Sequence, residues 1–370
     1  MRFASRMAKI DSSGIRKVFD LASMLKDPIN LSIGQPHYDV PDPVKDAAVK
    51  AIRDGRNQYT VTQGIPELRG KVRRHLEKTR GWTGEDLFIT SGTSGGIMLA
   101  LLVLVDEGDE VIIPDPYFVM YKHLTNLCAG KPVFVDTYPD FKLKADELEA
   151  AITPETKLVL LNSPCNPTGS VYSRSELAAL AEVLDRHGVL AISDEIYDSF
   201  CYDEKFASLV EVYPKRTLLL GGFSKTWGMT GWRLGYAAGP ADVIGEMVKL
   251  QQFSFVNAPS MVQDAGLAAL DYDPIHFRDE YRRKRDLIYE GLRKSFEVTR
   301  PGGAFYIFPK VPWGDDESFV KRAIEEKGLL VIPGSVFSEK HTHLRISYAA
   351  DDRTIQRGIE ALCALAEKRK

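Results

Sequence analysis

Short apolar, β-branched runs alternate with stretches of helical periodicity through the middle of the chain. The strand-like runs lie at residues 87–90, 110–113, 132–135, 157–162, 189–193 and 217–221. Apolar residues recur at helical spacing over 96–105, 173–187 and 242–252. Because strands and helices follow one another in turn, this pattern predicts an α/β fold with a mostly parallel sheet between two layers of helices.

The segments on either side of this block have a different pattern. Three prolines between residues 36 and 43 mark an extended segment that leads into a helix over 44–54. Near the C-terminus, apolar runs at 303–309, 330–333 and 344–347 predict strands that follow long helices. A chain of 370 residues usually divides into two units. We therefore expect a large domain over 45–275, and a smaller α+β domain formed by 1–44 and 276–370.

Composition narrows the class of protein. The chain is 44% apolar and 27% charged with a net charge of -3, which excludes a disordered protein and offers no basic face for nucleic acid. The longest apolar run, 97–105, is too short for a bilayer span, and the N-terminus lacks the apolar core of a signal peptide. We expect a cytoplasmic protein that binds neither nucleic acid nor membranes. The four cysteines form no CxxC pair, so neither a metal site nor a disulfide framework is expected.

Four polar clusters follow directly on predicted strands, which is unusual for four separate segments. They occupy residues 91–96, 162–169, 194–197 and 222–225. Ligands of open α/β sheets bind outside the carboxyl ends of the strands. The four clusters are therefore expected to meet at one edge of the sheet and to form one site.

The first cluster places small residues, among them Gly92, Thr93 and Ser94, just before an apolar helix. Free backbone N–H groups and the positive helix end make such a turn a seat for phosphate, although a plain turn has the same composition. The segment also matches the GxSxG elbow of α/β-hydrolases. A hydrolase needs a histidine beyond a late strand, whereas His341 and His343 precede the last predicted strand. The hydrolase is therefore only a remote alternative.

Two charged residues at strand ends indicate the chemistry. Asp194 ends an apolar strand, where a carboxylate is costly unless it is paired or has a function. Lys225 lies among glycines and Phe223, and a partly desolvated lysine loses its proton easily and can form an imine. Arg233 follows eight residues later and offers a planar fork that suits a phosphate.

Taken together, segments 166–169, 194–197 and 223–235 resemble those of class I and II aminotransferases. These belong to the aspartate-aminotransferase superfamily and have pyridoxal-phosphate (PLP) fold type I. The similarity runs from about residue 32 to residue 349, and the motifs are most similar to archaeal-type aromatic or broad-specificity members. One position departs from the common pattern, because Gly222 stands where many members carry a phosphate-binding serine.

The resemblance implies a role for each matching residue. It makes Lys225 the lysine that holds PLP as a Schiff base and the general acid and base, Asp194 the partner of the pyridine nitrogen, and Tyr197 and Asn166 the partners of the 3-oxygen. The phosphate would be held by Gly92, Thr93, Ser94, Ser224 and Arg233, and Phe118 would stack on the ring. Arg345 would grip the substrate α-carboxylate, Gly34 and Asn166 would line the same site, and Ile15 is a candidate for the side-chain pocket.

The resemblance also implies a reaction and a partner. An L-amino acid would give its α-amino group to a 2-oxo acid such as 2-oxoglutarate in a ping-pong mechanism, with aromatic, aspartate-like and broad specificities all open. The same fold also serves PLP-dependent C–S β-lyases, and a PLP-sensing regulator is a remote alternative. A homodimer with shared active sites is expected, in which Tyr59 reaches the PLP phosphate of the partner subunit.

Overall fold

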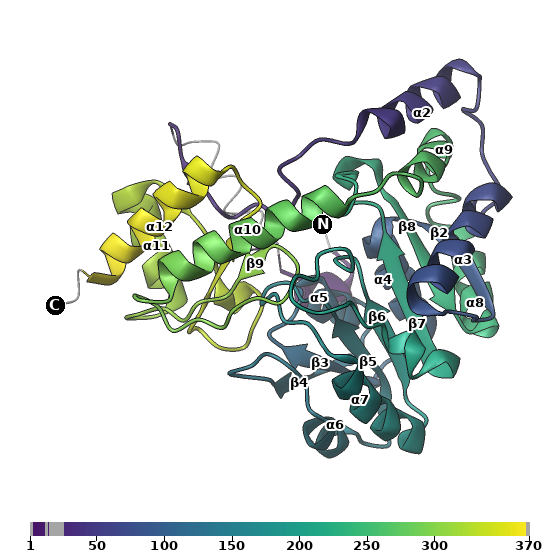
Figure 1. Ribbon diagram of the computed structural model, residues 1–370. Coiled ribbons are helices and arrows are strands. Elements are labelled where there is room, and N and C mark those ends of the chain that lie inside the picture. The colour runs from purple at the N-terminus through teal and green to yellow at the C-terminus, as the bar shows by residue number, and fades with distance from the viewer. Residues whose placement is uncertain (1–2, 12–13, 15–25, 368–370) are drawn as a thin grey trace.

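A seven-stranded sheet forms the centre of the larger part of the molecule (Figure 1). The computed structural model describes residues 3–11, 14 and 26–367. Within these residues the strand order is β2 (Asp86–Ser91), β8 (Leu234–Gly239), β7 (Thr217–Gly222), β6 (Leu190–Asp194), β5 (Thr156–Asn162), β3 (Glu110–Asp115) and β4 (Lys131–Asp136). The six strands that the sequence predicts in this region are all present.

Most neighbouring strands of this sheet are parallel, as the sequence predicts. The pairs β3–β4, β3–β5, β5–β6 and β6–β7 run parallel, whereas β8 runs antiparallel to both of its neighbours, β7 and β2. The sequence pattern does not predict β8, because its glycines and alanines weaken the strand signal. Gly235 of this strand packs on the first turn of the next layer, where an added Cβ would lie 2.7 Å from the Thr93 nitrogen.

Helices cover both faces of the sheet because alternate residues of each strand point to opposite sides. Leu158 and Leu160 of β5 pack with α4 (Gly92–Leu104) and α8 (Ala241–Gln252) on one face. Val159 and Leu161 pack with α6 (Ala145–Ala151) and α7 (Arg174–His187) on the other face. The remaining helices of this part are α2 (Asp42–Arg53), α3 (Pro66–Arg80), α5 (Met120–Leu127) and α9 (Ser260–Ala269).

The ends of α7 illustrate how local sequence sets a helix boundary. The Ser173 hydroxyl accepts a hydrogen bond from the Glu176 N–H, and the Glu176 carboxylate accepts one from the Ser173 N–H, which closes a capping box. The helix ends at Gly188, which has a φ of 65° that glycine adopts at little cost. The sequence predicts this helix to within one residue at its start.

The C-terminal part builds a second core around small sheets. Its helices are α10 (Ile275–Leu292), α11 (Asp316–Lys327) and α12 (Asp352–Glu367). A three-stranded sheet has the order β11 (Ile332–Pro333), β12 (Leu344–Ser347) and β9 (Tyr306–Ile307). The strand expected over 303–309 is shorter than predicted, because only residues 306 and 307 pair in a ladder.

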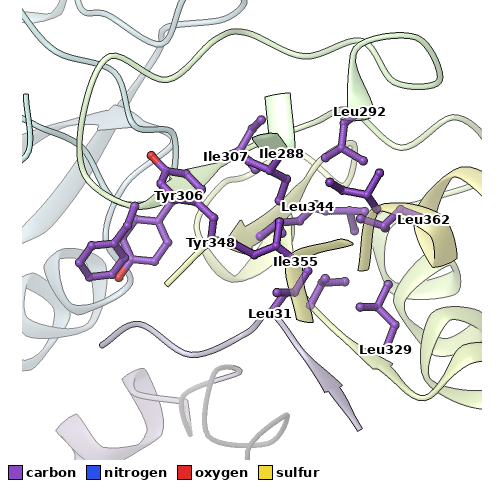
Figure 2. Packing of buried hydrophobic residues seen from close by; sticks show 14 of the residues in the cluster. Leu31, Ile288, Leu292, Tyr306, Ile307, Leu329, Leu344, Tyr348, Ile355 and Leu362 are labelled. Carbon is purple, nitrogen blue, oxygen red and sulfur yellow. The ribbon is translucent and has the colours of Figure 1, made fainter. Parts of the chain in front are cut away.

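The N-terminal arm joins this C-terminal core. Strand β1 (Ile29–Asn30) pairs in parallel with β10 (Leu329–Leu330), and Figure 2 shows Leu31 in the same buried cluster as Ile355 and Leu344. The proposed domain boundaries, at 44/45 and 275/276, stay a prediction.

Short 3₁₀ helices complete the described chain, namely η1 (Ser5–Lys9), η2 (Leu209–Glu211), η3 (Pro214–Arg216), η4 (Thr230–Trp232) and η5 (Gly334–Val336). No helix in the described chain has the length and apolarity needed to cross a bilayer.

Candidate active site

The four polar clusters converge on one cavity of about 300 Å³ at the carboxyl edge of the central strands. Each cluster contributes lining residues, and the N-terminal arm and the C-terminal core close the other sides. The lining residues are Ile33, Gly34, Gln35, Thr93, Ser94, Ile97, Phe118, Asn162, Asn166, Asp194, Ile196, Tyr197, Lys225, Thr230, Tyr306 and Arg345. The expected meeting of these clusters at one edge of the sheet is thus observed.

Lys225 follows β7 and extends its amine into the cavity. Its Nζ donates a hydrogen bond of 2.7 Å to the Gly34 carbonyl and lies 5.7 Å from the centre of the Tyr197 ring. Among the described residues it forms no ion pair. Burial, followed by the positive charges of Arg345 and Arg233, lowers the pKa of Lys225 from 10.5 to about 8. A substantial fraction of the amine is therefore neutral and nucleophilic near physiological pH.

Asp194 is the last residue of β6 and is buried at the floor of the cavity. Its carboxylate accepts hydrogen bonds from the Tyr121 hydroxyl at 2.7 Å and from the Ile196 N–H at 3.2 Å. Burial raises the pKa of Asp194 from 3.8 to about 6, although the hydrogen bond from Tyr121 opposes this shift. The carboxyl group is thus held in place and can bind a cationic or protonated group that enters the cavity.

Asn162 ties two of the clusters together. Its side-chain amide donates to the Asp194 carbonyl at 2.9 Å, and its side-chain oxygen accepts from the Asn166 N–H at 2.8 Å. The Asn166 side chain is buried and accepts a hydrogen bond from Arg345. Tyr197 follows Asp194 by three residues in the sequence. The hydroxyl groups of Tyr197 and Tyr306 are 2.9 Å apart.

Arg345 of β12 enters the cavity from the C-terminal core and is 1% exposed. It donates hydrogen bonds only to neutral oxygens, to the Ser32 carbonyl at 2.6 Å and to the Asn166 side chain at 3.3 Å. Its Nε has no partner, and within the described residues no carboxylate pairs with it. Burial lowers the pKa of Arg345. A buried guanidinium without a counter-charge is well placed to bind the carboxylate of a ligand.

The first turn of α4 and Arg233 form the other end of the site. Gly92 opens α4 with a φ of 68°, and an added Cβ would lie 2.5 Å from an Arg233 guanidinium nitrogen. Glycine at this position is what allows the guanidinium to approach the helix N-terminus. The Thr93 hydroxyl donates to the Gly221 carbonyl at 3.1 Å, so it is already occupied, whereas Ser94 lines the cavity. Helix N–H groups beside a guanidinium favour an anion.

Four expected site residues, Gly92, Arg233, Ser224 and Tyr59, do not line this cavity in the single chain. Ser224 is buried but does not line it, and Tyr59 is 84% exposed in a separate hollow. Ile15 lies outside the described residues. Gly222, the departure from the common pattern, has a structural reason, because a Cβ there would lie 2.8 Å from the Thr93 hydroxyl oxygen.

Among the residues of the site to which the sequence assigned no role are Tyr121, Asn162 and Tyr306. Tyr121 lies in the first turn of α5, three residues after Phe118, and the centres of the two rings are 5.7 Å apart. Asn162 stands at the carboxyl end of β5, so its position alone gave a signal. Tyr306 had no local signal, because it reaches the cavity from a strand of the C-terminal core.

The remote hydrolase alternative is wrong. None of the described lining residues is a histidine. His343 instead stacks on Phe308 with ring centres 5.1 Å apart, and His341 pairs with Asp316 at 3.3 Å. Ser94 therefore lacks the base that a Ser-His-Asp triad requires.

Comparison with known proteins identifies the family. The model of the family described as aminotransferase class I and II matches residues 26–362, most of the chain. The chain belongs to the class I and II aminotransferases. Among relatives of this aminotransferase, a probable aspartate aminotransferase of Methanocaldococcus jannaschii is 39% identical, with 96% of this chain and 97% of the relative covered.

Two solved aminotransferase structures have the same fold as this aminotransferase. The aspartate aminotransferase from Thermus thermophilus with maleate has a TM-score of 0.94 at 33% identity, covering 99% of this chain and 100% of the other. The aromatic aminotransferase from Pyrococcus horikoshii has a TM-score of 0.90 at 33% identity, covering 95% and 99%. The predicted family, fold and aminotransferase activity are confirmed, and the β-lyase alternative is not favoured.

Proposed function

We propose that this aminotransferase binds pyridoxal 5′-phosphate at Lys225 and moves the α-amino group of an L-amino acid to a 2-oxo acid. One observation carries the proposal: a lysine with a pKa near 8, a buried carboxyl group and an uncompensated guanidinium share one cavity. Pyridoxal phosphate supplies an electron sink that stabilises negative charge at the amino-acid Cα.

The residues present fit this cofactor. Arg233 and the first turn of α4 suit its phosphate, because Gly92 leaves no Cβ between them. Asp194 suits the pyridine nitrogen, since a fixed carboxylate keeps that nitrogen protonated. Tyr197 and Asn166 suit the 3-oxygen, and Phe118 suits a ring face.

The chain's own groups then have separate tasks. Arg345 binds the α-carboxylate through its guanidinium, whose Nε has no internal partner. Lys225 accepts the proton from Cα and returns it, because its pKa near 8 lets the amine serve as base and then as acid. The amino acid and the oxo acid both carry an α-carboxylate, so both bind at Arg345 in turn, and ping-pong kinetics follow.

Of the three substrate specificities left open, the cavity wall favours those for amino acids with neutral side chains. Besides Phe118, which suits the cofactor ring, Ile33 and Ile97 line it, and such apolar residues suit aromatic and aliphatic substrates. We test this with tyrosine, phenylalanine, leucine and aspartate, each supplied with 2-oxoglutarate. Glutamate should form with kcat/KM highest for an aromatic or aliphatic donor. Release of pyruvate and ammonia from cystathionine, without glutamate from any donor, would establish a β-lyase instead.

The surface around Tyr59 supports a homodimer. Tyr59 and Phe253 are 84% and 86% exposed, and Val61 is 56% exposed. A hollow of about 790 Å³ beside Tyr59 is lined by Phe255 and other residues of the same region. Exposed aromatic side chains on this scale mark a protein interface. We infer that a second copy covers this face and that Tyr59 acts in the partner's site.

Subunit exchange tests this arrangement. Lys225→Ala subunits are mixed and re-paired with Tyr59→Ala subunits. A two-fold interface that shares residues gives each hybrid one site with both lesions and one intact site, so activity should exceed that of either parent. If Tyr59 serves its own chain, both hybrid sites stay damaged and exchange brings no gain. The unmixed parents, taken through the same procedure, are the control.

A further inference from the structure

Tyr306 connects groups that the proposed mechanism uses separately. It belongs to β9, is 0% exposed, and lies 109 positions from Tyr197, whose hydroxyl is 2.9 Å away. Figure 2 shows Tyr306 in the C-terminal core together with Tyr348. In the described chain, Tyr197 is the one hydrogen-bond partner of the Tyr306 hydroxyl.

The ring of Tyr306 also lies against the carboxylate-binding side. The Arg345 guanidinium carbon is 4.8 Å from the ring centre, within the range of a cation–π contact. The strand register explains this contact, because Tyr306 pairs with Ser347 of β12, which points to the same face as Arg345 two residues earlier. An added Cβ at Gly34 would lie 2.9 Å from the Tyr306 oxygen, so the arm also closes on this hydroxyl.

The geometry of this pair allows either hydroxyl to donate, and the more complete burial of Tyr306 favours it as the donor. A fully buried hydroxyl proton needs an acceptor, and the oxygen of Tyr197 is the acceptor in reach of Tyr306. Tyr197 then receives this bond, and its own proton is left to point into the cavity. Burial raises the pKa of Tyr197, so its phenol keeps that proton at neutral pH. A hydroxyl that accepts one hydrogen bond also donates the next one more strongly.

We propose that Tyr306 is a positioning residue, which donates to Tyr197 so that the Tyr197 proton is directed at an anionic oxygen of the bound ligand. Under the proposed function, on which this inference rests, that oxygen is the 3-oxygen of pyridoxal phosphate. Through its ring, the same residue holds the guanidinium of Arg345.

The test uses Tyr306→Phe, which removes the hydroxyl and keeps the ring. The readout is the pH midpoint of the visible absorbance change in the cofactor-loaded protein. Loss of the Tyr306 hydroxyl weakens the hydrogen bond that Tyr197 donates to the 3-oxygen. The protonated form of the bound cofactor then persists to higher pH, so the midpoint should rise by about half to one pH unit. The KM for amino acids should change less than twofold, because the ring still contacts Arg345.

Two further variants make the test specific. Tyr348→Phe removes another buried hydroxyl from the same core, one that donates to the Ala304 carbonyl at 3.2 Å, and should leave the midpoint unchanged. In a Tyr197→Phe background, Tyr306→Phe should add no further shift, because its effect passes through Tyr197.

An unshifted midpoint in Tyr306→Phe, or an equal shift in the Tyr197→Phe background, would overturn the inference and leave the proposed function intact. A parent protein that gains no visible absorbance with pyridoxal phosphate would overturn the proposed function itself. The two failures are therefore distinguishable in one experiment.

Discussion

Two buried arginines, Arg80 beside Glu195 and Arg345 in the cavity, have opposite electrostatic surroundings. Arg80, at the end of α3, donates to the Glu195 carboxylate at 2.8 Å and also pairs with Asp198. Burial alone would lower the pKa of Arg80, but the facing negative charges, led by that of Asp198, raise it instead. Arg345 is as deeply buried and has no carboxylate partner in the described chain, and its pKa is lowered.

The difference separates a structural charge from a functional one. A buried ion pair with its hydrogen bonds satisfied is complete within the chain, as at Arg80, where the Ser193 and Ser208 hydroxyls also bind Glu195. Within the part of the chain that the structure describes, Arg345, Lys225 and Asp194 each lack an ion pair inside one cavity, a state that costs stability until a ligand supplies the missing charge. The following variants test this contrast.

The largest effect is expected at Lys225. Lys225→Ala removes the amine that is proposed to move the Cα proton. Amino transfer should fall by about 10²–10⁴-fold or more, measured as glutamate formed from 2-oxoglutarate and the best donor. Partial recovery with added methylamine would support loss of a proton carrier. Unchanged turnover in the variant would exclude Lys225 from the chemistry.

Arg345→Met should separate catalysis from stability. Losing one partner of a desolvated charge pair costs about 2–5 kcal/mol. The kcat/KM should therefore fall by the factor that corresponds to this free energy, for amino acids and oxo acids alike. The free energy of unfolding of the cofactor-free protein should stay equal or rise, since an uncompensated charge is removed. Urea denaturation checks the second expectation, and a stability loss above 2 kcal/mol would contradict it.

Arg80→Met makes the same chemical change on the structural side and should give the converse result. It leaves the Glu195 carboxylate buried without its cation, which costs about 3–5 kcal/mol of unfolding free energy. Protein that remains folded should keep its KM for amino acids. An Arg80→Met protein as stable as the parent would break the contrast between the two arginines.

Asp194→Asn gives a smaller, pH-dependent effect on the cofactor-free protein. The fold raises the pKa of Asp194 from 3.8 to about 6, so the native state holds this proton more tightly than the unfolded state. The contribution of Asp194 to the free energy of unfolding is therefore fully present below pH 3.8 and is lost as the pH rises through 6. The loss amounts to up to about 3 kcal/mol. The variant should be more stable than the parent at pH 7.5, and this advantage should shrink towards pH 4. Urea titrations at both pH values decide.

Much of the fold was predictable because buried parallel strands leave continuous apolar runs. The run at 157–162 became β5 (Thr156–Asn162) almost residue for residue. Strand β8 escaped because LGYAAG has few large apolar residues. It also pairs antiparallel with β7, a reversal that periodicity does not encode.

The site was predictable where chemistry follows a strand end and hidden where contacts are long-range. Asp194 and Lys225 stand directly after predicted strands, so position and residue type sufficed. Tyr121 is 73 positions from Asp194, and Tyr306 is 109 positions from Tyr197. Their contacts depend on how α5 and the C-terminal core pack, which no local pattern contains.

Chemical trapping tests the central claim, the assignment of Lys225, most directly. The purified protein is loaded with pyridoxal phosphate, reduced with borohydride, digested and analysed by mass spectrometry. The expected result is loss of the visible absorbance on reduction and one phosphopyridoxyl group on the peptide that contains Lys225. Modification of a different lysine in place of Lys225, or no stable modification at all, would contradict it.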